Sequence, residues 1–128
     1  MASGTVPKYA AGIDSGWQSI TGTANNSYPF TGTIYYRKIG DVFYLTTSAI
    51  NLKSQLAAKS YILLFTLAEG YRPITGSLVV NGFINTSAVD NRTIPLRIAG
   101  NGEMYIYSNL DAIETSYNIY ISGVGLLD

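Results

Sequence analysis

Few side chains in this sequence could carry out acid–base or metal chemistry. The 128 residues include no histidine and no cysteine, which removes the commonest general base, the thiolate nucleophile and the usual zinc ligands. A glycosidase needs two carboxylates about 5–10 Å apart, and Asp90, Asp111 and Glu114 are the acids that could meet. The same three could hold calcium, but no stretch has the alternating acids of a calcium loop. We favour solvated loop acids and expect a protein that is not an enzyme, with no metal or cofactor.

Other residues suit saccharide binding. Tyr28 stands in the stretch "NNSYPF" (25–30), beside Asn26. A planar ring with amide and hydroxyl neighbours suits sugars, which offer an apolar face and directional hydroxyl groups; an ordinary surface loop is the alternative. Arg92 could grip a phosphate or carboxylate, or form an ion pair with Asp90 in its own loop. The predicted ligand-binding residues are Tyr28, Asn26, Asp90, Arg92, Asn109 and Asp111.

The aromatic residues have a second possible role. The single tryptophan, Trp17, could stack on a sugar, although its place in a predicted strand favours the core. Tyr35 and Tyr36 must face opposite sides of a sheet, whereas Tyr105 and Tyr107 share one side. Some of these rings must therefore lie outside the core or in a subunit interface.

The composition fits one β-rich domain. Hydrophobic residues make up 47% of the chain, and eight basic residues balance eight acidic ones. A neutral chain lacks the basic face that nucleic acid needs, and no apolar run approaches the roughly 20 residues that would insert into a membrane. We expect residues 1–12 to form a tail or a connection to a shaft, and residues 13–128 to form a single head domain.

Two-residue alternation and short apolar runs predict an all-β protein, an antiparallel β-sandwich or jelly-roll of about eight strands. Segment 51–59 ("NLKSQLAAK") is either a helical turn or a loop. Pro95, inside one predicted strand, should mark an edge, a strand start or a bulge. The predicted strands are 16–20, 32–39, 42–49, 60–67, 76–84, 93–100, 103–109 and 116–127.

The order of the strands predicts where binding occurs. Adjacent antiparallel strands alternate in direction, so successive connections fall at opposite ends of the sandwich. The tight turns, at 40–41, 68–73 and 100–102, then share one end with both termini. The long connections, at 21–31, 50–59, 85–92 and 109–115, share the other end. Because loops on a rigid scaffold usually carry binding, we expect recognition at the long-loop end.

Four motifs also recur in a characteristic order: "YYRKIGDVFYL" (35–45), "FTLAEGYRP" (65–73), "RIAGNGEMYIY" (97–107) and "YISGVGLL" (120–127). Together they resemble the carboxy-terminal β-domain of tail-fibre and baseplate proteins from phages of Gram-positive bacteria. "GWQSI" (16–20) resembles the opening tryptophan strand of that domain. The sequence departs from the family at Ala68-Glu69, where proline-alanine is more usual.

This resemblance implies a homotrimeric receptor-binding head at the phage tail tip or baseplate of the virion. It would recognise a bacterial surface saccharide, either cell-wall polysaccharide or teichoic acid, and would join other tail or baseplate proteins through its N-terminal side. A trimerisation or baseplate-assembly domain with no ligand of its own is the alternative. The resemblance carries over no residue-level binding site.

The shared motifs read as scaffold. Arg72 precedes Pro73, which biases it towards extended geometry, and Gly70 can adopt the positive φ that a turn needs. We therefore expect Arg72 to hydrogen-bond the backbone or stack on a tyrosine within this turn.

Overall fold

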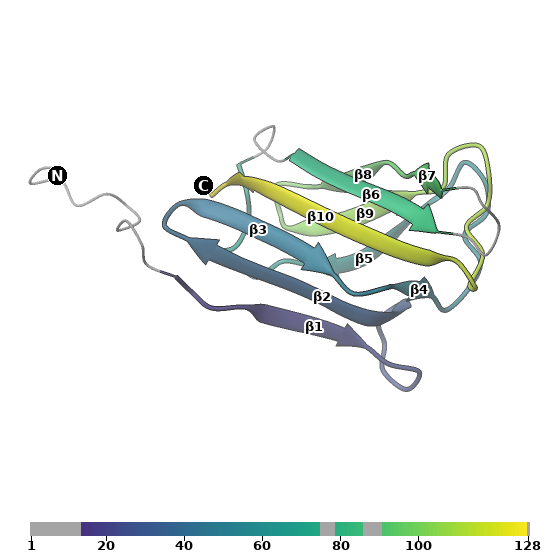
Figure 1. Cartoon of the computed structure of the whole chain (residues 1–128), viewed down its shortest axis with the longest axis horizontal. Coiled ribbons are helices and arrows are strands. Elements are labelled where there is room, and N and C mark those ends of the chain that lie inside the picture. The colour runs from purple at the N-terminus through teal and green to yellow at the C-terminus, as the bar shows by residue number, and fades with distance from the viewer. Residues whose placement is uncertain (1–13, 75–78, 86–90, 128) are drawn as a thin grey trace, which may run out of the picture.

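The protein is a sandwich of two antiparallel β-sheets, as the alternation predicts (Figure 1). The computed structural model describes residues 14–74, 79–85 and 91–127, so the predicted N-terminal tail lies outside the described residues. The described residues form ten strands rather than about eight. They are β1 (Gln18–Gly22), β2 (Phe30–Ile39), β3 (Val42–Thr47), β4 (Asn51–Leu52), β5 (Tyr61–Thr66), β6 (Val79–Asn85), β7 (Asn91–Thr93), β8 (Leu96–Ile98), β9 (Glu103–Tyr107) and β10 (Asn118–Leu126).

The strands divide unequally between the two sheets. The large sheet runs β1-β2-β3-β10-β6-β7, with β4 paired to β2, and the small sheet runs β5-β9-β8. Strand β10 therefore lies between β3 and β6, although it is last in the sequence. Within the described ranges, no helix is long and apolar enough to cross a membrane.

The core lies between the sheets and is built from alternate residues of each strand. On β10, Ile119 and Ile121 point into the core and are buried, whereas Ser122 points outwards and is exposed. Leu64 of β5 and Ile106 of β9 cover them from the small sheet and belong to the same buried cluster. This alternation leaves the other face of each sheet exposed to solvent.

One predicted strand is divided in the structure, and one segment that the sequence left open is decided by it. The predicted strand at 93–100 is divided at Pro95: β7 belongs to the large sheet and β8 to the small one. Proline cannot donate to a sheet ladder, and here it directly precedes an edge strand, where the chain passes between sheets. Segment 51–59 contains β4 but no helical turn, because Leu52 pairs with Phe30 and Leu56 bridges to Ile113.

The predicted arrangement of the two ends is confirmed for the described residues. At the terminal end, the Leu127 N–H donates to the Asp41 carbonyl at 2.9 Å, and the Leu67 N–H donates to Gly102 at 2.8 Å. At the other end, which we call the distal end, the long connections are bonded to one another, as where Leu56 and Ile113 exchange two backbone hydrogen bonds. Figure 1 shows the β1–β2, β4–β5 and β9–β10 connections at the end of the sandwich opposite the β2–β3 turn.

The turn at 68–73 is scaffold, as expected. Arg72 Nε donates to the Leu67 carbonyl at 3.0 Å, and Gly70 has φ +93°. The Lys38 ammonium donates to the Gly70 carbonyl at 3.1 Å and lies 4.7 Å from the centre of the Tyr71 ring. Arg72 therefore uses its side chain to hold the backbone of this turn.

The next hairpin is held by a carboxylate. The Asn101 amide and the Tyr105 hydroxyl both donate to Glu103 Oε1 at 2.9 Å. These bonds stabilise the charged carboxylate, so they lower the pKa of Glu103. The same bond raises the pKa of Tyr105, because ionised tyrosine could no longer donate.

We predict unequal costs for alanine at two glycines with positive φ. Gly70→Ala should lower the free energy of unfolding by about 1–2 kcal/mol, the cost of a left-handed alanine, since its new methyl would meet only the flexible end of Lys38, at 3.6 Å. Gly102→Ala should cost at least about 1 kcal/mol more, since its methyl would lie 2.6 Å from the Leu67 oxygen and 2.7 Å from Arg72 Nε. Urea denaturation measures both, and equal losses would contradict the packing of this turn.

Candidate functional site

The distal end contains a hollow of about 430 Å³, which we call the distal pocket. It brings together three of the six predicted ligand-binding residues, Arg92 from β7 and Asn109 and Asp111 from the connection after β9. Its remaining lining residues are Thr93, Ser108 and Leu110. The pocket therefore forms where an edge strand of the large sheet meets a loop that leaves the small sheet.

Arg92 mainly holds the connection after β9 in place, and its charge is largely used within the protein. One guanidinium nitrogen donates to the carbonyls of Asp111 and Ala112, at 2.9 and 3.0 Å. The other lies 3.6 Å from the Asp111 carboxylate, whose side chain is 81% exposed. The ion pair of Arg92 is therefore made with Asp111, whereas Asp90, its predicted partner, lies outside the described residues.

Asn109 divides the distal pocket from a second hollow of about 420 Å³, the tyrosine hollow. Lys59, Ser60, Pro95 and Tyr107 complete its lining. Asn109 and Lys59 both have positive φ, and the Lys59 N–H donates to the Asn109 carbonyl. Among the described residues, neither the Asn109 amide nor the Lys59 ammonium has a side-chain partner, so both can reach a ligand.

Ser108 supports this arrangement from below. Its side chain is almost fully buried, at 1% exposure. The hydroxyl accepts the Ser60 N–H at 3.0 Å and donates to the Ala57 carbonyl. One buried hydroxyl group thereby joins the two segments that carry Lys59 and Asn109. It fixes the relative positions of these two residues at the edge of the hollows.

Tyr28 and Asn26 do not join the other candidates. They precede β2, near one edge of the large sheet, whereas Arg92 belongs to β7 at the opposite edge. The Asn26 side chain is used within its own loop, where it accepts the Thr23 N–H at 3.1 Å and donates to the Thr21 carbonyl at 2.9 Å. Tyr28 is half-buried, with its ring 5.5 Å from that of Phe30. Both residues shape the loop in this structure.

Two of the three acids considered for catalysis or calcium have separate partners, and the third, Asp90, lies outside the described residues. Asp111 faces Arg92, and Glu114 accepts a hydrogen bond from the Gln55 amide at 2.7 Å. Among residues 14–74, 79–85 and 91–127, no group of three acids could hold a metal ion.

Sequence reasoning missed Lys59, Tyr107 and Leu110. Lys59 is the last residue of segment 51–59, for which the sequence allows a helical turn or a loop. No local pattern predicts the positive φ that it adopts. Tyr107 was expected to share a side with Tyr105, and its outward position agrees with that pattern. Leu110 is 72% exposed at the tip of its loop, and an apolar residue within a polar loop was the available signal.

Replacing Arg92 tests whether it positions the loop. Arg92→Ala removes two charge-assisted hydrogen bonds, to the carbonyls of Asp111 and Ala112, so it should lower the free energy of unfolding by about 1–3 kcal/mol. It should also accelerate amide exchange in the connection after β9. The matched control is Arg97→Ala, since Arg97 is exposed on β8, and a change within about 0.5 kcal/mol is expected there. Equal effects of the two variants would refute the positioning role.

Comparison with known proteins supports the fold. The sequence matches no protein-family model and no curated protein. Among solved structures, the chain is similar to the crystal structure of the head domain of phage bIL170, determined in a study of whether the receptor-binding domains of lactococcal phages share a common fold. The alignment covers 87% of this chain and 97% of that domain, with a TM-score of 0.60 and 15% sequence identity. At this identity the likeness establishes architecture, and the chain therefore has the fold of a phage head domain.

Proposed function

We propose that this chain is the receptor-binding head of a phage tail device, located at the tail tip or baseplate of the virion. It binds a bacterial surface carbohydrate, cell-wall polysaccharide or teichoic acid, and does not act as an enzyme. The observation that carries the proposal is the fold likeness over almost the whole of a phage head domain. The motifs at 35–45, 65–73, 97–107 and 120–127 support it independently, because they come from the sequence alone.

The two distal hollows are the proposed receptor site. Asn109 offers an amide, Asp111 an exposed carboxylate, and Tyr107 a ring beside Pro95. Such a mixture suits the hydroxyl groups and apolar face of a sugar. Lys59 replaces Arg92 as the proposed partner of a phosphate in teichoic acid, because the hydrogen bonds of Arg92 go to loop carbonyls.

Placement at the distal end suits a head that is joined to other tail or baseplate proteins through its N-terminal side. One such site should bind weakly, because sugars exchange hydrogen bonds with water for little net gain. Attachment would then depend on several copies binding the same cell surface at once.

The proposed homotrimer would assemble through the outward side of the small sheet, which we call the tyrosine face. Tyr61 and Leu63 are 63% and 37% exposed there, and the Tyr61 ring lies 5.6 Å from both Tyr105 and Tyr107. Rigid aromatic clusters of this kind are enriched in interfaces. Because Tyr61 pairs with Tyr107, the tyrosine hollow would lie at the rim of this interface.

The assembly has a direct test. Light scattering at micromolar concentration should give about three times the 13.8 kDa chain mass. Tyr61→Ser with Leu63→Ser should shift that mass towards one chain, since it removes apolar area from the interface. A parent protein of 13.8 kDa would contradict the proposed trimer.

Receptor binding is tested with a variant that preserves the loop. In Asn109→Gly with Asp111→Ala, glycine keeps the φ of +59° that Asn109 has while the amide and carboxylate are lost. We expect attachment of the purified domain to host cell wall to weaken about tenfold or more, which is about 1.4 kcal/mol. Melting temperature and assembled mass should not change.

Asp41→Ala with Glu69→Ala is the matched control, because it removes two acids from turns at the opposite end. Loss of attachment in the control alone would place the receptor site at the terminal end. If the assembled parent does not attach to cell wall at all, the alternative function holds, and the domain is an assembly module without a ligand of its own. Release of sugar from the wall would instead indicate an enzyme.

A further inference from the structure

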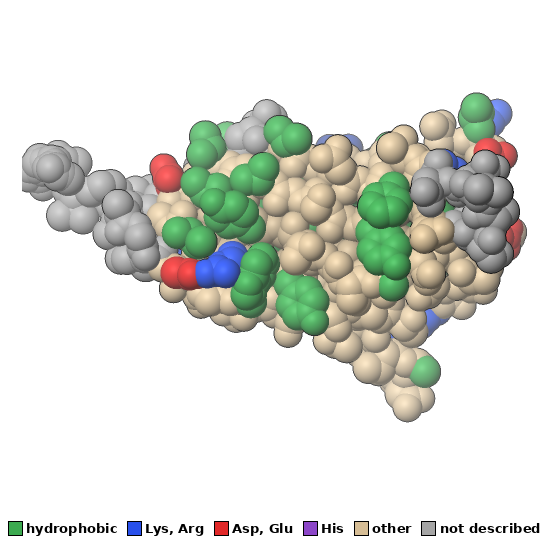
Figure 2. Space-filling view, viewed as in Figure 1, with side chains coloured by type: hydrophobic (Ala, Val, Ile, Leu, Met, Phe, Trp, Pro, Cys, Tyr) green, Lys and Arg blue, Asp and Glu red, His purple; other side chains and the backbone are tan. Residues whose placement is uncertain are grey.

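The outward face of the large sheet has an ordered pattern that the distal site does not explain. Strand register aligns its outward residues into rows that cross the sheet. One row is Arg37, Tyr44, Val124 and Val79, with Trp17 beside Arg37 just before β1 begins; the next is Ser19, Tyr35, Thr46, Ser122 and Asn81; the third is Tyr120, Phe83 and Thr93. Figure 2 shows the result, two groups of apolar side chains separated by a band without them.

The first row forms one ridge. Trp17 is 49% exposed, Val79 63% and Val124 42%, so the expected burial of Trp17 in the core was wrong. The indole is held on the surface, because the Arg37 guanidinium lies 4.9 Å from its ring centre and the Tyr35 ring meets it edge-on at 6.5 Å. A tryptophan held in this way offers a fixed aromatic surface.

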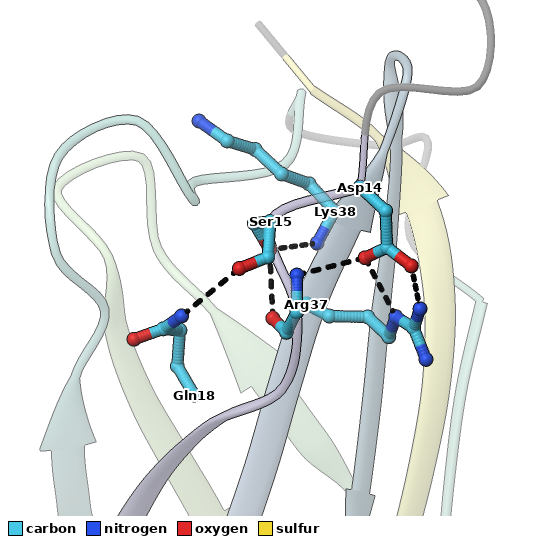
Figure 3. A network of polar contacts seen from close by, with 6 residues as sticks. Asp14, Ser15, Gln18, Arg37 and Lys38 are labelled. Atoms are coloured by element: carbon cyan, nitrogen blue, oxygen red, sulfur yellow. Dashed lines mark hydrogen bonds and ion pairs between the residues drawn. The ribbon is translucent and has the colours of Figure 1, made fainter.

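The charge on this ridge is already neutralised. Arg37 Nε donates to one oxygen of Asp14 at 3.1 Å, and its terminal nitrogen pairs with the other (Figure 3). The Gly16 N–H also donates to Asp14, at 2.8 Å. Ser15 ties the same segment to β2, because it exchanges two hydrogen bonds with Lys38. The segment that carries Trp17 is therefore anchored, and Arg37 is not free to attract an anion.

The opposite ridge is a pair of stacked rings. Phe83 of β6 and Tyr120 of β10 are cross-strand partners, with ring centres 5.2 Å apart and planes inclined by 21°. Phe83 is 42% exposed. Tyr120 is four residues from Val124 along β10, so the ridges stand about 13 Å apart at 3.3 Å per residue.

Short polar side chains lie between the ridges. Thr46, Ser122 and Asn81 are exposed and adjacent across β3, β10 and β6. In the part of the chain that the structure describes, their hydroxyl and amide groups make no side-chain hydrogen bond. Together with Trp17, Tyr44 and Val124 they line a hollow of about 430 Å³. We call the space between the two ridges the sheet groove.

We infer that the sheet groove binds a neutral glycan chain that runs across the strands. Its unpaired hydroxyl and amide groups can exchange hydrogen bonds with sugar hydroxyls, and its aromatic walls can cover the apolar faces of the rings. A second copy of the chain, or an apolar protein segment, would leave these polar groups buried without partners, which is costly. Among the described residues of the groove the cation is Arg37, which is paired with Asp14, so none of these residues offers a free cation to an anionic glycan. This site is separate from the distal pocket, and the inference does not depend on the receptor site proposed there.

Trp17 is the single tryptophan, so its fluorescence reports on the groove directly. The probes are linear hexasaccharides of glucose, rhamnose and N-acetylglucosamine, with a glycerol-phosphate hexamer as the anionic comparison. At least one neutral hexamer should change Trp17 emission saturably, and the anionic hexamer should not. If no neutral hexamer does so, or if the anionic hexamer alone does, the inference is overturned.

Two variants locate the binding. Ser122→Leu places a branched apolar side chain on the groove floor while leaving every ridge residue in place, and should abolish the fluorescence titration. Phe83→Ser removes one stacked ring and should weaken the titration about tenfold. Tyr61→Ser on the tyrosine face is the matched control and should titrate as the parent does, as should the distal variant Asn109→Gly with Asp111→Ala.

The same variants distinguish other occupants. If Ser122→Leu or Phe83→Ser lowers the assembled mass, the groove is a contact between copies of the chain and the inference fails. If the distal variant abolishes the neutral-hexamer titration, the groove is not a separate site. A failure of the distal variant to affect cell attachment would refute the proposed receptor site alone, because the Trp17 titration is read independently.

Discussion

The two-residue alternation of β10, at the centre of the large sheet, is the constraint on which the rest of the structure depends. Ile119 and Ile121 must enter the core, where both are almost fully buried. Tyr120 and Ser122 must then face outwards, since a strand turns successive side chains to opposite sides. A register shift of one residue would expose the isoleucines and bury the polar side chains. The same burial that stabilises the sandwich therefore also specifies the chemistry of its outer face.

A second constraint acts at the distal end, where long connections would otherwise leave backbone groups unpaired. Arg92 satisfies two carbonyls, and the Asn51 amide donates to the Tyr117 carbonyl at 2.9 Å. Buried Ser108 joins the segments on either side of it. Most of the polar groups that the sequence offers for binding are thus used to hold loops. The groups left for a ligand, such as Asn109 and Lys59, are presented by a backbone that is already ordered.

The low charge of the chain connects the two proposed sites. The chain has eight acids and eight bases, and at each proposed site the arginine is paired with an acid, as Arg37 with Asp14 and Arg92 with Asp111. At both proposed sites, recognition would then rest mainly on aromatic rings, amides and hydroxyls. The distal end retains Lys59 beside Asn109, whereas the sheet groove is neutral. The two surfaces therefore suit glycans of different charge.

The sequence by itself determined the local and directional features of this protein. Alternation predicted the strands, glycines predicted the tight turns, and strand direction predicted which connections share an end, because these depend on neighbouring residues and on the reversal at each turn. Tertiary structure decided the pairing of distant strands. Insertion of β10 between β3 and β6 aligned Thr46, Ser122 and Asn81, and the width of the large sheet separated Tyr28 from Arg92. Trp17 shows the same limit: it was assigned to a strand from the sequence, but it lies just before β1, on the surface against Arg37 and Tyr35 of β2. Such pairings join residues tens of positions apart, and no local pattern encodes which two strands will meet.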